Sequence, residues 1–124
     1  MKRLIFLPIL ALFAITFAEE RYTDRYDNLN LDEIMSNKRL LASYIKCVLD
    51  KGRCAPEAKE LKLHLIDAVQ NSCLKCTEFQ KTGARKVVKF IRENDKDSWE
   101  QIKQKYDPNN EYKEKYEAFL AGEN

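Results

Sequence analysis

Four cysteines are the residues of this sequence whose types and spacing are best suited to chemistry. They follow the pattern C-x6-C-x18-C-x2-C, and the last pair forms the C-x-x-C of "NSCLKC". A C-x-x-C occurs in redox dithiols, in halves of zinc sites and in short structural disulfides. No strand–helix–strand pattern surrounds this one, which disfavours the redox centre. The choice between zinc and disulfide depends on the compartment.

His64 is the sole histidine, and Asp67 lies about one helical turn further on. A His–Asp pair is a component of some hydrolytic sites. Here the pair lacks both a nearby Gly-rich calcium loop and the dense cysteine framework of small secreted phospholipases. We therefore predict that the chain is not an enzyme, has no catalytic residue, and carries His64 as a partly exposed structural residue.

Residues 1–18 have the pattern of a secretory signal peptide. Two basic residues precede the apolar run 4–17, and Thr16 and Ala18 are the small residues that a signal peptidase requires. The run is too short and too abruptly followed by charges to be a membrane anchor. We predict a secreted, extracellular protein whose domain spans residues 19–124, without stable membrane insertion.

In a secreted chain, an even number of cysteines indicates a disulfide framework rather than a metal site. Three pairings are possible, and we favour the local one, Cys47 with Cys54 and Cys73 with Cys76, because the partners lie within one or two helical turns. We expect no metal ligand and no cofactor.

The charges do not indicate a nucleic-acid partner. Of the 22 basic residues, Lys2 and Arg3 fall in the signal, which leaves 20 against 20 acidic residues and a net charge near zero. No one-signed excess remains to attract phosphate. The Lys/Glu clusters are typical of solvated helix faces on a monomer, with docking to a membrane receptor as the alternative.

Every long segment has apolar residues at helical period, which predicts an all-α single domain of about six helices. The segments begin near residue 31 and then cover 37–50, 55–73, 77–94, 95–106 and 112–120. The expected start signals are Asn30, Pro56, Thr77 and Asp95 or Asp97, with Gly52 ending the second helix.

The segment "RYTDRYDNLNLDEIMSNKRLLASYIKCVLDKGRC" resembles the opening of the insect chemosensory proteins, the OS-D family. The cysteine spacing, "PEAKELK", "CLKC" and the "KYDP" turn match that family too, over essentially the whole mature chain. The resemblance implies a compact helical prism with two small disulfide loops. It also implies a soluble carrier of small hydrophobic ligands, such as fatty acids, long-chain alcohols and pheromone or odorant-like lipids, in an internal channel.

The resemblance assigns roles to several aromatic residues. Tyr44 resembles a channel tyrosine that bonds the ligand head group, and Tyr26 and Asp27 resemble positions at the channel mouth. Trp99 and Tyr116 resemble shared aromatic positions, and Tyr112 stands where some relatives have tryptophan. The expected ligand-binding set is completed by the apolar residues Leu31, Leu41, Ile45, Val48, Leu61, Leu65 and Val87.

The residues by themselves leave a second interpretation open. Six tyrosines suit a cavity that accepts a hydrocarbon and one polar end, but aromatics at helical spacing are more often ordinary core. In that case the interior is solid and the protein acts through its surface, as an extracellular signalling, developmental or regeneration factor.

Overall fold

The computed structural model describes residues 21–122, which form six helices and no strand. The all-α prediction is confirmed for residues 21–122. The predicted signal peptide lies outside the described residues. The helices are α1 (Leu31–Ser36), α2 (Lys38–Val48), α3 (Pro56–Asn71), α4 (Glu78–Asn94), α5 (Lys96–Tyr106) and α6 (Lys113–Leu120).

The helix starts follow the local signals of the sequence. The Asn30 side chain accepts a hydrogen bond from the backbone of Glu33, and Pro56 is the first residue of α3. Thr77 and Gln80 form a reciprocal capping box at the start of α4. Asp95, rather than the alternative Asp97, caps α5.

The end of α2 differs from the expectation for Gly52. The helix ends at Val48, and Asp50 adopts a left-handed conformation with φ of 61°. The carboxylate of Asp50 contacts Lys62 and Lys105, and a short acidic side chain tolerates this backbone region better than most residues. The chain therefore turns two residues before the glycine.

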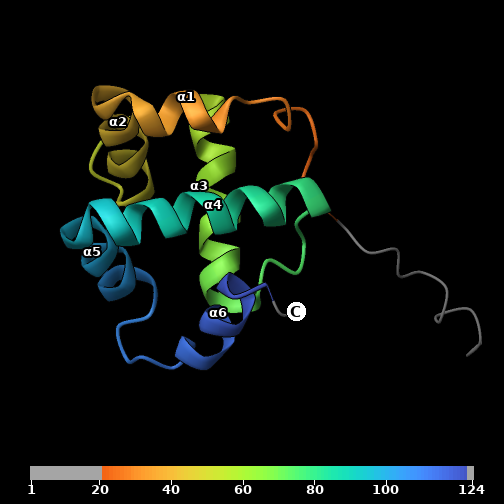
Figure 1. Ribbon diagram of the computed structural model, residues 1–124, viewed down its shortest axis with the longest axis vertical. Coiled ribbons are helices and arrows are strands. Elements are labelled where there is room, and N and C mark those ends of the chain that lie inside the picture. The colour runs from red at the N-terminus through yellow and green to blue at the C-terminus, as the bar shows by residue number, and fades with distance from the viewer. Residues whose placement is uncertain (1–20, 123–124) are drawn as a thin grey trace, which may run out of the picture.

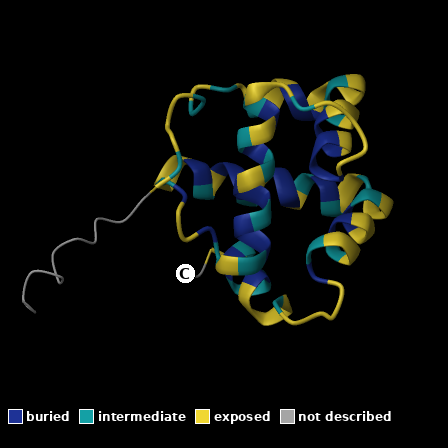
Figure 2. Ribbon diagram, turned by 180° about the vertical axis from the view of Figure 1, so that it is seen from behind, coloured by how far each residue is buried: buried dark blue, intermediate teal, exposed yellow. Residues whose placement is uncertain are grey.

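Helices α3 and α4 cross at the centre of the molecule (Figure 1), and they pack against each other. Helices α1 and α2 lie on one side of α4, and α5 and α6 lie towards the other end of α3. The buried residues line the inward faces of all these helices, whereas the outward faces are exposed (Figure 2). One continuous apolar core results.

Both predicted disulfides are present. Cys47 and Cys54 join the end of α2 to the segment before α3, and Cys73 and Cys76 close the loop between α3 and α4. No cysteine is left free in this part of the chain. The small loops hold helix ends in place, because a short closed loop removes little entropy from the unfolded chain.

Candidate ligand-binding site

A small cavity lies between α1, the segment before it, α3 and the first turns of α4. Its volume is about 30 Å3. Apolar side chains and polar side chains both line it. The lining residues are Tyr26, Asp27, Leu29, Leu31, Glu57, Glu60, Leu61, His64, Phe79, Gln80, Gly83 and Ala84.

Gly83 allows α1 to approach α4 closely at this cavity. A Cβ atom at residue 83 would lie 2.9 Å from Cδ1 of Leu31, which is closer than side-chain carbons normally pack. Helix α1 has six residues, of which Ile34 and Met35 are buried, and it packs against both α2 and α4. Leu31 is the residue of α1 that lines the cavity, so one short helix closes this side of it.

Asp27 fastens the segment before α1 to the start of α4. Its carboxylate accepts hydrogen bonds from Nε2 of Gln80 at 2.8 Å and from the Thr77 hydroxyl at 3.2 Å. Gln80 Nε2 also donates to the backbone oxygen of Thr23. Asp27 thus lines the cavity, yet its carboxylate is already used by protein donors.

His64 is buried, with 8% of its surface exposed, so the prediction of a partly exposed histidine was wrong. Its Nε2 lies 3.3 Å from Oε1 of Glu60, which precedes it by one helical turn. Neither atom has a hydrogen-bond partner among the described residues. The His–Asp pair considered from the sequence is therefore replaced by a His–Glu pair that faces the cavity.

Burial disfavours the protonated imidazole of His64. It lowers the pKa of His64 below its ordinary value, and this effect outweighs the opposing charge and close side-chain contact of Glu60 and the charges of Asp27 and Asp67. The ring of Tyr22 packs on the imidazole with centroids 5.0 Å apart. Burial, followed by the charges of Asp67 and Glu60, raises the pKa of Tyr22 to about 12.

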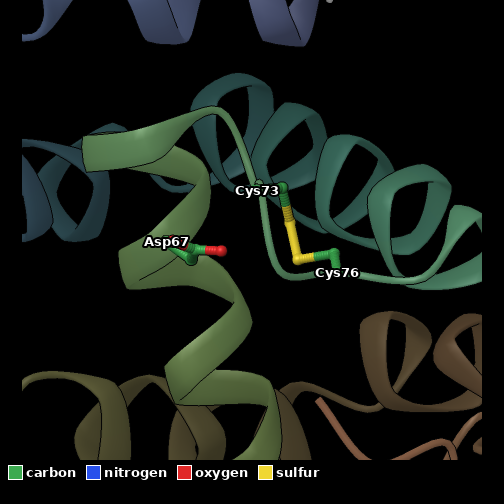
Figure 3. Close-up of side chains that lie close together, drawn as sticks. All are labelled: Asp67, Cys73 and Cys76. Atoms are coloured by element: carbon green, nitrogen blue, oxygen red, sulfur yellow. A yellow bond between two sulfur atoms is a disulfide. The ribbon is translucent and has the colours of Figure 1, made fainter. Parts of the chain in front are cut away.

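Asp67 lies next to the Cys73–Cys76 disulfide on the side of α3 that faces the loop (Figure 3). Its carboxylate accepts hydrogen bonds from the Lys75 backbone and from the Asn71 side chain, both at 3.1 Å. The two sulfur atoms are bonded to each other, so they are not thiolate ligands. Asp67 positions the disulfide loop.

The predicted ligand-binding residues separate into four groups. Those that line the cavity are Tyr26, Asp27, Leu31 and Leu61. Two others, Leu41 and the buried Ile45, line an outer groove that α2 forms with the ends of α1 and α4, next to Met35 and Phe90. The residues buried in the core are Tyr44, Val48, Leu65, Val87, Trp99 and Tyr116, while Tyr112 is half-buried at its edge.

The predicted aromatic ligand contacts Tyr44, Trp99 and Tyr116 are buried in the core. Trp99 and Tyr116 meet edge to face, with ring centroids 5.8 Å apart. Tyr44 is 9% exposed, and burial, followed by the charge of Glu57, raises its pKa. These rings therefore remain predicted ligand contacts that a ligand would reach only after the core rearranges.

Sequence reasoning missed several residues that line the cavity. Phe79 and Gln80 lie in the first turn of α4, and Gly83 lies one turn later. The spacing of Glu60 and His64 by four residues was a usable signal, because such residues share one face of a helix. No sequence signal shows that this face meets an incompletely filled space.

Fold and site together define a small disulfide-linked helical protein with a partly apolar cavity that several polar groups line. The model of the insect pheromone-binding family, A10/OS-D, matches residues 22–114. The chain belongs to this family.

The relatives agree with that assignment. The sequence is 42% identical over 118 residues to "Ejaculatory bulb-specific protein 3" of Drosophila melanogaster, covering 95% of this chain and 93% of that protein. Antennal chemosensory protein A6 from the moth Mamestra brassicae is 50% identical with a TM-score of 0.69, covering 82% of this chain and 94% of that one.

A further solved structure is of a chemosensory protein in complex with bromo-dodecanol. It is 52% identical with a TM-score of 0.69, and the match covers 78% of this chain and 97% of that protein. Within residues 21–122, no helix is both long enough and apolar enough to span a membrane.

Proposed function

We propose that this protein is a secreted carrier that takes a small hydrophobic ligand into its interior and makes or breaks no bond in it. The candidate ligands are fatty acids, long-chain alcohols and pheromone or odorant-like lipids. The observation that carries the proposal is the cavity of Leu31, Leu61, Gly83 and Ala84, whose apolar wall adjoins buried polar groups. Family membership and the bromo-dodecanol complex of a relative support it.

The size of the cavity favours a binding mode in which the protein rearranges. Pockets for small molecules usually measure about 300–1,000 Å3, whereas this cavity measures about 30 Å3. A long alkyl chain therefore has to displace side chains of the core as it enters. Such an exchange is favourable when the tail restores close packing, because the burial of each methylene contributes about 0.8 kcal/mol to the free energy of binding.

We infer that α1 is the wall that moves. It is six residues long, its Leu31 touches α4 at Gly83, and its Met35 borders the outer groove of Leu41 and Ile45. Displacing α1 would join the cavity to that groove. The predicted residues Leu31, Leu41 and Ile45 would then line one continuous channel with Tyr26 and Leu61.

Displacement of a fluorescent apolar probe tests the carrier function. Saturated alcohols and fatty acids of about ten to eighteen carbons should displace the probe from the purified protein with micromolar constants. Ala84→Val, which fills part of the cavity, should weaken the binding of the probe. Thr82→Val, at an exposed position of the same helix, is the matched control. Failure of every chain length would defeat the carrier proposal.

A surface function is the second candidate, because Leu74 in the Cys73–Cys76 loop is 72% exposed and Phe79 is 55% exposed. Large apolar side chains at the surface are typical of contact sites. If an extracellular partner, such as a membrane receptor, binds here, Leu74→Ser should abolish the biological response and leave probe binding unchanged. The carrier function predicts the opposite pattern: Ala84→Val should reduce both probe binding and the biological response, whereas Leu74→Ser should leave both unchanged.

A further inference from the structure

Glu60 and His64 form an incompletely satisfied polar pair on the cavity wall. Their side chains are 18% and 10% exposed, and both residues line the cavity. Glu60 Oε1 and His64 Nε2 lie 3.3 Å apart, and neither atom makes a hydrogen bond within residues 21–122. Buried polar atoms are almost always hydrogen-bonded. A third group that lies on the cavity side of the pair, within hydrogen-bond distance of both atoms, would satisfy both.

The pair offers one acceptor and one donor. A carboxylate accepts hydrogen bonds, and a neutral imidazole with its proton on Nε2 donates one. The complementary group must donate once and accept once. It must also be small, because a cavity of about 30 Å3 has room for about two water-sized groups.

We propose that Glu60 and His64 bind the terminal hydroxyl of a long-chain alcohol and discriminate against the carboxylate of a fatty acid. The hydroxyl proton is donated to Oε1 of Glu60, and the hydroxyl oxygen accepts from Nε2 of His64. Leu61 and Ala84 contact the first methylenes of the alcohol. This inference rests on the proposed carrier function and specifies its ligand class.

The charges around the pair explain the discrimination. Glu57, Glu60 and Asp27 line the cavity, and no lysine or arginine from residues 21–122 does so. The other titratable groups that face His64 are Tyr22, whose ring covers the imidazole, and Asp67 on the same helix. A fatty acid would therefore bury a negative charge among negative charges, whereas an alcohol would bury none.

The test compares ligands with one tail and different ends. Dissociation constants for 1-dodecanol, dodecyl methyl ether and dodecanoate are measured at pH 7.5 by displacement of the apolar probe. Dodecanol should bind at least about tenfold more tightly than dodecanoate and about fivefold more tightly than the ether, which accepts a hydrogen bond but donates none.

Two glutamate variants separate the charge at the proposed head-group site from the general negative charge of the cavity. Glu60→Gln should reduce the dodecanol-to-dodecanoate ratio about tenfold. Glu57→Gln removes the same charge from the same cavity and is the matched control, so it should change the ratio about threefold or less. His64→Gln is a second probe of the pair if Glu60→Gln does not fold, as judged by circular dichroism. It should lower dodecanol affinity about fivefold.

The outcomes distinguish this inference from the carrier proposal. If the wild type binds neither probe nor any of the three ligands, the carrier proposal itself fails. If it binds all three but dodecanoate binds as tightly as dodecanol, only the head-group site is overturned. Equal effects of Glu60→Gln and Glu57→Gln would also overturn it, because charge alone would then explain the preference.

Discussion

Gly83→Ala should leave the stability of the protein nearly unchanged and weaken its ligand binding. The added methyl group would meet the end of the Leu31 side chain at 2.9 Å, and nothing else lies within 4 Å of it apart from neighbouring backbone. The far end of a leucine can change rotamer, whereas a backbone atom could not yield in this way. The substitution therefore tests the α1–α4 contact without forcing the helices apart.

The free energy of unfolding receives two opposing contributions. Alanine stabilises a helix interior relative to glycine by about 0.8–1.0 kcal/mol, and position 83 lies inside α4. An off-rotamer leucine costs about 0.5–1.5 kcal/mol. The net change is therefore within about 0.7 kcal/mol of zero, which corresponds to at most about 3–6 °C in the melting temperature.

Ligand binding receives only an unfavourable contribution. The new methyl group and the displaced Leu31 take the space of about one methylene of the ligand, which is about 0.8 kcal/mol or fourfold in the dissociation constant. Urea unfolding and probe displacement on the same preparation measure both quantities. Thr82→Ala, exposed on the same helix, is the control and should stabilise slightly without changing binding.

Two results would refute this reasoning. Unchanged binding with unchanged stability would show that the ligand does not use the space beside Leu31. A loss of more than about 1.5 kcal/mol of stability would show that α1 is held rigidly at this contact, which contradicts its assignment as the moving wall.

Three further predictions concern stability and the thiols. Asp107→Ala should destabilise the protein by about 3 kcal/mol in urea, because its buried carboxylate accepts hydrogen bonds from the backbones of Glu111 and Tyr112; a loss below about 1 kcal/mol would contradict this role. Stability should fall as the pH drops below about 6.5, because the unfolded chain then binds a proton that His64, with its lowered pKa, resists in the folded state. His64→Gln should remove that part of the pH dependence, and an unaltered profile would show that other groups cause it. Finally, the denatured, unreduced protein should titrate with no free thiol, since both cystines are formed; four reactive thiols would disprove the disulfide assignment.

The helices could be predicted because their signals are local. Asn30, Pro56 and Thr77 act on the backbone within the next turn of chain, so the letters alone place those boundaries. The turn at Asp50 escaped prediction, because its unusual conformation accompanies contacts with Lys62 and Lys105, and Lys105 comes from the distant helix α5.

The candidate site divides in the same way. Family resemblance pointed to Tyr26 and Asp27, the apolar pattern added Leu31 and Leu61, and the structure gathers these four at one cavity. The expected ligand-binding set also included Leu41 and Tyr44, which lie in an outer groove and in the packed core. Periodicity shows that a residue faces inward, but it does not show which neighbour it meets.

The sequence by itself determined the helical class, the helix starts, the disulfide pairing and the family, since these depend on spacing along the chain. Only the tertiary structure decided that His64 is buried beside Glu60, that the side chain of Leu31 packs on Gly83, and that the cavity is small and lined in part by polar groups. The physical reason is that burial and the pairing of polar groups depend on how the crossing of α3 and α4 fills space. Local residue preferences do not specify that crossing.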